Sequence, residues 1–176
     1  MICRLPTKEE RTQINRALDR WGAFEFFKHK SLIIQEEVGT KKNKVVCLVT
    51  DGLEKVVQAI NPYSAGLAIG ELKKQFLPSI AGADLFARNR ERKNKYYIKV
   101  GDQAEKLVLY GRDIMGESIV EASDALDENE LVIVLNTAYE AIAVGRTRFA
   151  GRSLLQKGRV TVSTIADAGY YLREEG

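Results

Sequence analysis

A run of basic side chains lies in the C-terminal third of the chain and contains no acidic residue. The charged residues of segment 141–159 are Arg146, Arg148, Arg152, Lys157 and Arg159. From Asp113 to Glu140, by contrast, every charged residue is acidic. Guanidinium and ammonium groups bind phosphate, and guanidinium groups also stack on bases. The pattern therefore indicates either a surface for an anionic partner or two neighbouring faces whose charges balance each other.

The net charge is small and unevenly divided. The 176 residues carry a formal net charge of +3. Residues 1–92 contain 16 Lys and Arg against 11 Asp and Glu, or +5, whereas residues 93–176 contain 11 against 13, or −2. Because the C-terminal half is not basic overall, any anion-binding site in it must be local.

Several classes of site are disfavoured by the residues that are missing. Cys3 and Cys47 show no CxxC spacing, which indicates a reducing compartment and neither a disulfide framework nor a metal site. His29 is the sole histidine, and Asp51 and Asp84 stand outside any catalytic motif. We therefore expect no catalytic residue, no cofactor and no metal.

The chain also lacks the signals of membrane insertion and export. There is no apolar run of about 18 residues, and the N-terminus has no apolar signal-peptide core. We expect a soluble protein of the cytoplasm, or of the nucleus and nucleolus in a eukaryotic source, with no membrane partner.

A charged segment poor in apolar residues, RNRERKNK at residues 88–95, divides the chain. Such a run is typical of a solvated linker, and strand and helix patterns restart beyond it. We therefore expect two domains, at residues 1–92 and 93–176. The predicted fold class is α+β, with an N-terminal α/β domain built from an antiparallel sheet and helices.

The N-terminal domain is predicted to begin with a helix over residues 8–21. Thr7 is suited to be its N-cap, and Glu10, three residues later, completes a capping box. Apolar and aromatic side chains then recur at near-helical spacing, which predicts a buried, aromatic-rich face. These residues are Ile14, Leu18, Trp21, Phe24 and Phe27.

A β-hairpin and a second helix are expected next. Segments 31–37 and 44–50 are rich in apolar and β-branched residues, and the residues between them, 38–43, suit a turn. Asp51 then offers an N-cap to a helix over residues 52–60.

The C-terminal domain is predicted to be mostly strands. Strands are expected near residues 95–100, 118–122, 131–137, 141–148 and 159–164. A helix is expected over residues 103–110, with Gly111 closing it. Short strands with turn signals at this spacing indicate a small β-barrel or β-sandwich with one or two helices.

Alternation along residues 141–148 raises a question about the arginines. Arg146 and Arg148 share the parity of Ile142 and Val144, so an unbroken strand would place all four on one face. A buried, unpaired arginine is very costly. Either Gly145 is a bulge that turns the later residues outward, or the apolar pair is buried only in the first half of the strand.

Longer segments resemble a known family. Residues 95–123, 131–149 and 157–175 resemble a PUA domain, an RNA-binding module. Beyond the module, RLPTKEER, KVVCLVTDGLEKVVQAI and ADAGYYLREE resemble, in the same order, the ribosome-biogenesis factors of the nuclear import protein seven family, closest to its archaeal members. The similarity covers nearly the whole chain.

This resemblance implies a fold and a function. The family pairs an N-terminal α/β domain with a C-terminal PUA domain, a small β-barrel with flanking helices. Its members act in large-subunit ribosome assembly and pre-rRNA processing, bind RNA and ribosome-assembly proteins, and have no known enzymatic activity. Arg112 lies where PUA domains often approach RNA, so we add it to the basic residues of segment 141–159 as an RNA-binding candidate.

We therefore expect a non-enzymatic protein that binds single-stranded or looped RNA, and no DNA, through a basic edge of the C-terminal domain. The acidic segment 113–140 is expected to form the opposite face and to repel RNA. One alternative is that the basic residues pair with that acidic segment. A second is an RNA-modification enzyme or accessory subunit in which the PUA domain delivers tRNA or rRNA.

Overall fold

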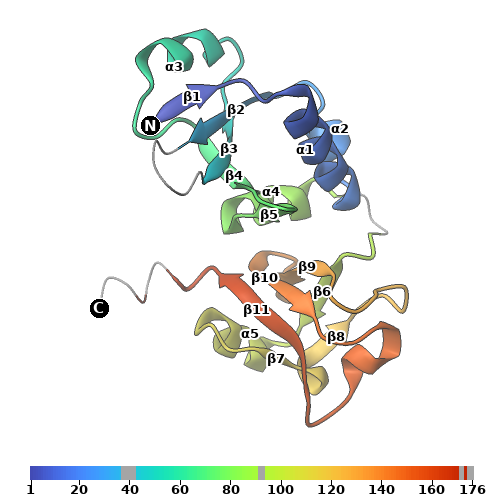
Figure 1. Ribbon diagram of the computed structural model, residues 1–176. Coiled ribbons are helices and arrows are strands. Elements are labelled where there is room, and N and C mark those ends of the chain that lie inside the picture. The colour runs from blue at the N-terminus through green and yellow to red at the C-terminus, as the bar shows by residue number, and fades with distance from the viewer. Residues whose placement is uncertain (37–42, 91–93, 171–172, 174–176) are drawn as a thin grey trace. The chain divides into compact units, whose positions relative to one another are not determined.

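The computed structural model describes residues 1–36, 43–90, 94–170 and 173, in two compact units (Figure 1). The first unit is Met1–Asn89 and the second is Arg90–Gly176. The hairpin turn expected at residues 38–43 lies almost wholly outside the described residues, as does the junction between residues 92 and 93 where we expect the domain boundary.

The first unit is built on a five-stranded sheet with the strand order β1-β2-β3-β4-β5. All its pairings are antiparallel. The strands are β1 (Ile2–Arg4), β2 (Ser31–Glu36), β3 (Lys44–Val49), β4 (Leu67–Leu72) and β5 (Phe76–Pro78). Strands β2 and β3 pair along their whole length, which confirms the predicted hairpin strands.

The helices of this unit are α1 (Lys8–Arg20), α2 (Phe24–Phe27), α3 (Glu54–Ile60) and α4 (Ile80–Arg88). The predicted capping box of α1 is confirmed. The Thr7 hydroxyl accepts a hydrogen bond from the Glu10 amide at 3.2 Å, and the Glu10 carboxylate accepts one from the Thr7 amide at 2.9 Å. Each contact satisfies a backbone donor that the helix itself leaves unpaired.

Aromatic rings fill the core beside α1. The ring of Trp21 stacks on that of Phe86 with centroids 5.6 Å apart and planes 10° apart. The ring of Phe27 meets Phe86 edge-on, with centroids 5.5 Å apart. Trp21 and Phe27 are buried, as predicted, while Phe24 is half-buried. These aromatic residues therefore serve the core.

The predicted N-cap of the second helix is wrong. Helix α3 begins at Glu54 and its N-cap is Leu53, whose side chain makes no capping bond. The Asp51 carboxylate instead accepts hydrogen bonds from the Ser31 amide at 3.2 Å and the Ser31 hydroxyl at 3.0 Å. Asp51 reaches Ser31 because the end of β3 pairs with the start of β2.

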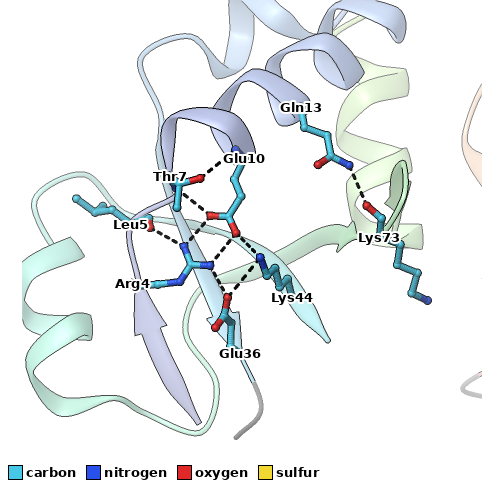
Figure 2. A network of polar contacts seen from close by, with 8 residues as sticks. All are labelled: Arg4, Leu5, Thr7, Glu10, Gln13, Glu36, Lys44 and Lys73. Carbon is cyan, nitrogen blue, oxygen red and sulfur yellow. Dashed lines mark hydrogen bonds and ion pairs between the residues drawn. The ribbon is translucent and has the colours of Figure 1, made fainter. Parts of the chain in front are cut away.

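An ion-pair network joins α1 to the edge of the sheet (Figure 2). The Arg4 guanidinium donates to both Glu10 carboxylate oxygens, at 2.6 and 2.7 Å, and also to Glu36. The Lys44 ammonium donates to Glu10 at 2.7 Å. Glu10 is buried, and hydrogen bonding from Arg4 holds its pKa well below the usual range. The network therefore links β1, α1, β2 and β3.

The second unit is a nearly closed barrel of six strands in the order β7-β11-β10-β9-β6-β8. Strands β6 and β9 are parallel, and the other pairs are antiparallel. The strands are β6 (Tyr97–Val100), β7 (Ile114–Met115), β8 (Ile119–Glu121), β9 (Leu131–Leu135), β10 (Ala141–Thr147) and β11 (Val160–Asp167).

Short helices complete this unit: α5 (Asp102–Leu109) and the 3-10 turns η1 (Gly116–Ser118) and η2 (Gly151–Leu155). Gly111 follows α5 with φ +74°, which confirms its predicted role. Two strand ends differ from the prediction. Strand β9 stops at Leu135 because Asn136 organises the turn that follows, and β11 continues to Asp167.

The core of the second unit is aliphatic. Ile98, Val132, Val134, Leu154 and Val162 are among its buried members. Strands β9 and β10 bring side chains from both of their faces into buried positions, since both lie in the middle of the sheet. None of the helices in the described ranges combines the length and the apolar character that crossing a membrane requires.

Candidate nucleic-acid interface

One face of strand β10 leaves the core after its fifth residue, while Thr147 on the other face stays buried. The five residues 141–145 are all buried, Arg146 is half-buried and Arg148 is exposed. Ile142 and Val144 are therefore buried while the arginines of the same parity emerge at the rim. The sequence left two alternatives, a bulge at Gly145 or burial only in the first half of the strand. The structure shows the second.

Gly145 is not the residue that bulges. The register between β10 and β11 does shift between Val144 and Gly145, but the extra residue is Ile165 of β11. Gly145 serves close packing instead, because a Cβ atom there would lie 2.6 Å from Cγ1 of Val162. The predicted break was at the right place along β10, but it belongs to the partner strand.

Strand β11 connects four of the six sequence-predicted residues, while Arg152 lies in η2 and Lys157 lies between η2 and β11. Arg159 directly precedes this strand, Arg146 pairs with Ser163, and the Arg148 amide donates to the Thr161 carbonyl at 2.8 Å. The Arg112 carbonyl accepts from the Thr164 hydroxyl at 2.8 Å. We call the six residues the basic edge: Arg112, Arg146, Arg148, Arg152, Lys157 and Arg159.

Arg148 is paired with an acid of the preceding segment. Its Nη2 lies 2.8 Å from Oδ2 of Asp113, and its Nε donates to the Ser163 hydroxyl at 2.6 Å. The other oxygen of Asp113 accepts from the Thr164 amide at 2.9 Å. Asp113, which directly precedes β7, therefore connects the start of that strand to β11 and holds the Arg148 guanidinium against the sheet.

Arg152 makes a more exposed pair. Its Nε lies 3.0 Å from Oδ2 of Asp124, and the two side chains are 87% and 62% exposed. Pairs with this exposure contribute about 0 to 1 kcal/mol to folding. A phosphate could thus replace Asp124 as the partner of Arg152 with little loss of stability.

The remaining members of the basic edge have no acidic partner among the described residues. Arg146 donates to the Asn129 carbonyl at 2.9 Å. Arg159 donates to the Gln156 side chain at 3.1 Å, and its guanidinium carbon lies 4.7 Å from the ring centroid of Phe149. Arg112 and Lys157 are exposed. These cations keep donors for an anionic partner.

The predicted separation of acidic and basic faces is wrong. Asp113 and Asp124 belong to the acidic segment, yet both pair directly with arginines of the basic edge. The cause is the path of the chain: the Gly151 amide donates to the Leu126 carbonyl at 2.8 Å, so the acidic loop packs beside η2. Charge balance thus accounts for Arg148 and Arg152 but not for the other four residues.

One side chain that the sequence did not single out also shapes this edge, because Phe149 supplies the ring beside Arg159. Asp113 and Asp124 orient two arginines, as the alternative of pairing with the acidic segment expected. The position of Phe149, an aromatic residue directly after Arg148 within the basic segment, was a signal in the sequence that could have indicated its role. Nothing in the spacing indicated which acid pairs with which arginine, because these contacts join residues 28 and 35 positions apart.

Two family models match the chain. The model described as the NIP7/UPF0113 pre-PUA domain matches residues 3–80, and the model described as the UPF0113 PUA domain matches residues 96–176. A UPF0113 protein of Archaeoglobus fulgidus is 34% identical over 177 residues, covering 99% of this chain and 97% of that protein.

Solved structures share the fold. A conserved PUA domain protein of Thermoplasma acidophilum superposes with a TM-score of 0.69 at 18% identity, covering 98% of both chains. A hypothetical protein of Pyrococcus horikoshii superposes with a TM-score of 0.71 at 18% identity, covering 99% of both chains. Both likenesses extend over the N-terminal sheet and the barrel together.

Proposed function

The chain belongs to the NIP7/UPF0113 family, and from this membership we propose that it is a non-enzymatic, RNA-binding factor of ribosome biogenesis. Family membership and the PUA domain suggest RNA binding. In the proposal, residues 93–176 bind pre-ribosomal RNA through the basic edge, and residues 1–92 bind ribosome-assembly proteins. The protein then acts in large-subunit assembly and pre-rRNA processing.

The observation that carries the proposal is the set of cations without an acidic partner. Arg146 pairs with Ser163 of β11, the Arg112 carbonyl accepts from Thr164 of the same strand, and Lys157 and Arg159 lie within three residues before it. None of these four cations forms an ion pair within the described residues. Phosphate contacts supply much of the affinity of nucleic-acid binding, and arginine adds stacking on unpaired bases. Single-stranded or looped RNA fits such a short edge.

The protein-binding half is supported by an apolar surface on the first unit. Leu53, Val56 and Ile60 are exposed and recur at the three- and four-residue spacing that places side chains on one face of α3 and its N-cap. Ile60 is 67% exposed. Exposed apolar side chains on one helix face are typical of a protein-interaction surface. In the proposal, a ribosome-assembly protein covers it.

Crosslinking in cells tests the RNA half. The protein is crosslinked to RNA, purified under denaturing conditions, and the bound RNA is sequenced. Enrichment of ribosomal RNA precursors is expected. Recovery of mature tRNA bearing a modification that is lost on deletion of the gene would contradict the proposal and favour an accessory role in RNA modification.

Affinity purification with and without Ile60→Glu tests the protein half. The charged side chain should remove the ribosome-assembly proteins that mass spectrometry identifies with the wild-type protein. RNA binding should stay unchanged, because α3 belongs to the other unit. Equal recovery of those proteins with both forms would refute the assignment of α3.

A further inference from the structure

We propose that Tyr139 is a platform on which one base of the bound RNA stacks, beyond the basic edge. The residue lies in the turn between β9 and β10, and Arg146 and Arg148 lie at the other end of β10. The inference rests on the proposed function, because it assigns a second contact to the same RNA. It gives the second unit two points of attachment.

Tyr139 occupies a backbone conformation that its side chain does not favour. Its φ is +63°, and the other non-glycine residues with positive φ in the described ranges are Asn61 and Asn129. Asparagine enters this region far more readily than a bulky aromatic residue. Tyr139 is 48% exposed, so core packing does not explain why an aromatic residue occupies this position. Disfavoured conformations of this kind concentrate at functional sites.

Asn136 holds the turn rigidly. Its side-chain oxygen accepts hydrogen bonds from the amides of Ala138 and Glu140, at 3.0 and 2.9 Å. Its side-chain nitrogen donates to Glu105 of α5 and to Glu140, each at 3.0 Å. Asn136 is buried, so the backbone beneath Tyr139 is fixed before any ligand arrives. A fixed ring loses little conformational freedom when a base stacks on it.

Two cations lie beside the ring. The Lys99 ammonium is 4.4 Å from the centroid of Tyr139 and donates to its hydroxyl at 2.9 Å. The Arg90 guanidinium carbon is 5.5 Å from the same centroid and 5.0 Å from that of Tyr97. An exposed ring beside positive charge is the combination that binds single-stranded nucleic acid, because the ring takes the base and the cation takes the phosphate.

Lys99 has capacity for such a phosphate. An ammonium group has three donors. One reaches Tyr139 and one reaches Glu121 at 2.9 Å. The hydrogen bond to Tyr139, and then the one to Glu121, raise the pKa of Lys99, so its charge persists at neutral pH. The third donor is left for a phosphate next to the stacked base.

The length of β10 sets the distance between the two contact points. Strand β10 runs from Ala141 to Thr147, which is six steps of about 3.3 Å, so its two ends lie about 20 Å apart, with Tyr139 just before one end and Arg148 directly after the other. A short oligonucleotide therefore reaches one point, and a longer strand reaches both. Two linked contacts bind more tightly than either alone.

Binding of single-stranded RNA oligonucleotides of increasing length to the full chain tests the inference. Base stacking on an aromatic ring is worth enough that Tyr139→Asn should weaken binding of long oligonucleotides by about 5-fold or more. Binding of the shortest oligonucleotides that still bind should change less. Tyr139→Phe keeps the ring and should bind like the wild type. Tyr63→Asn, an exposed tyrosine of the first unit, is the matched control.

A fluorescent base reports the stacking itself. Oligonucleotides that carry 2-aminopurine at successive positions should be quenched at one position by the wild-type protein and by Tyr139→Phe, and not by Tyr139→Asn. Equal affinity and equal quenching for the wild type and Tyr139→Asn would overturn the inference and leave RNA binding intact. Failure of the wild-type protein to bind any RNA would overturn the proposed function as well.

Discussion

Replacing Asp124 by asparagine should tighten RNA binding. The Asp124 carboxylate lies 3.0 Å from Nε of Arg152, and a phosphate on the outer side of that guanidinium would lie about 6 Å from the carboxylate. In solvent of dielectric constant about 80, repulsion at this distance is about 0.7 kcal/mol, or about 3-fold in Kd. The free energy of unfolding should change by less than about 1 kcal/mol, because the pair is exposed.

Fluorescence anisotropy with a labelled single-stranded RNA measures the effect at low and at high salt. The gain should shrink as salt rises, since screening weakens the repulsion that is removed. Glu25→Gln is the control, because it makes the same change in net charge at an exposed pair with Lys28 in the other unit. Unchanged or weaker binding by Asp124→Asn, or an equal gain in Glu25→Gln, would refute the reasoning.

Three further predictions concern stability and reactivity. Glu10→Gln should lower the free energy of unfolding by about 2 to 3 kcal/mol in denaturant titrations, since it breaks a largely buried pair. Because the pKa of Glu10 is lowered by folding, this difference should be complete above about pH 4.3 and shrink as the pH falls further. Gly145→Ala should cost about 1 to 3 kcal/mol, and it should cost less in a Val162→Ala background than in the wild type. Burial raises the pKa of the Cys47 thiol to about 11, so alkylation at pH 8 should be slow until denaturant is added.

Elements with local signals were predictable from the sequence. The capping box of Thr7 and Glu10 placed the start of α1 at the observed residue, and Gly111 marked the end of α5. The strands of the hairpin were visible in their β-branched composition. In each case the deciding interactions lie within a few residues along the chain, where sequence patterns are informative.

Features that depend on distant pairing were not predictable. The bulge beside Gly145 resides in β11, at Ile165, and arises from the fit of two strands. The partners of Arg148 and Arg152 come from residues far back in the chain. The left-handed conformation of Tyr139 could not be predicted from its residue type, because glycine and asparagine are the residues that usually adopt this conformation. Which members of the basic edge touch RNA stays a prediction.

The salt dependence of RNA binding tests the central claim most directly. For single strands, the slope of log K against log salt falls by about 0.7 in magnitude for each phosphate contact that is lost. Replacing Arg152 and Lys157 together by alanine should therefore weaken binding and flatten this slope by up to about 1.4 relative to the wild type. An unchanged affinity and slope in this double variant would contradict the assignment of RNA binding to the basic edge.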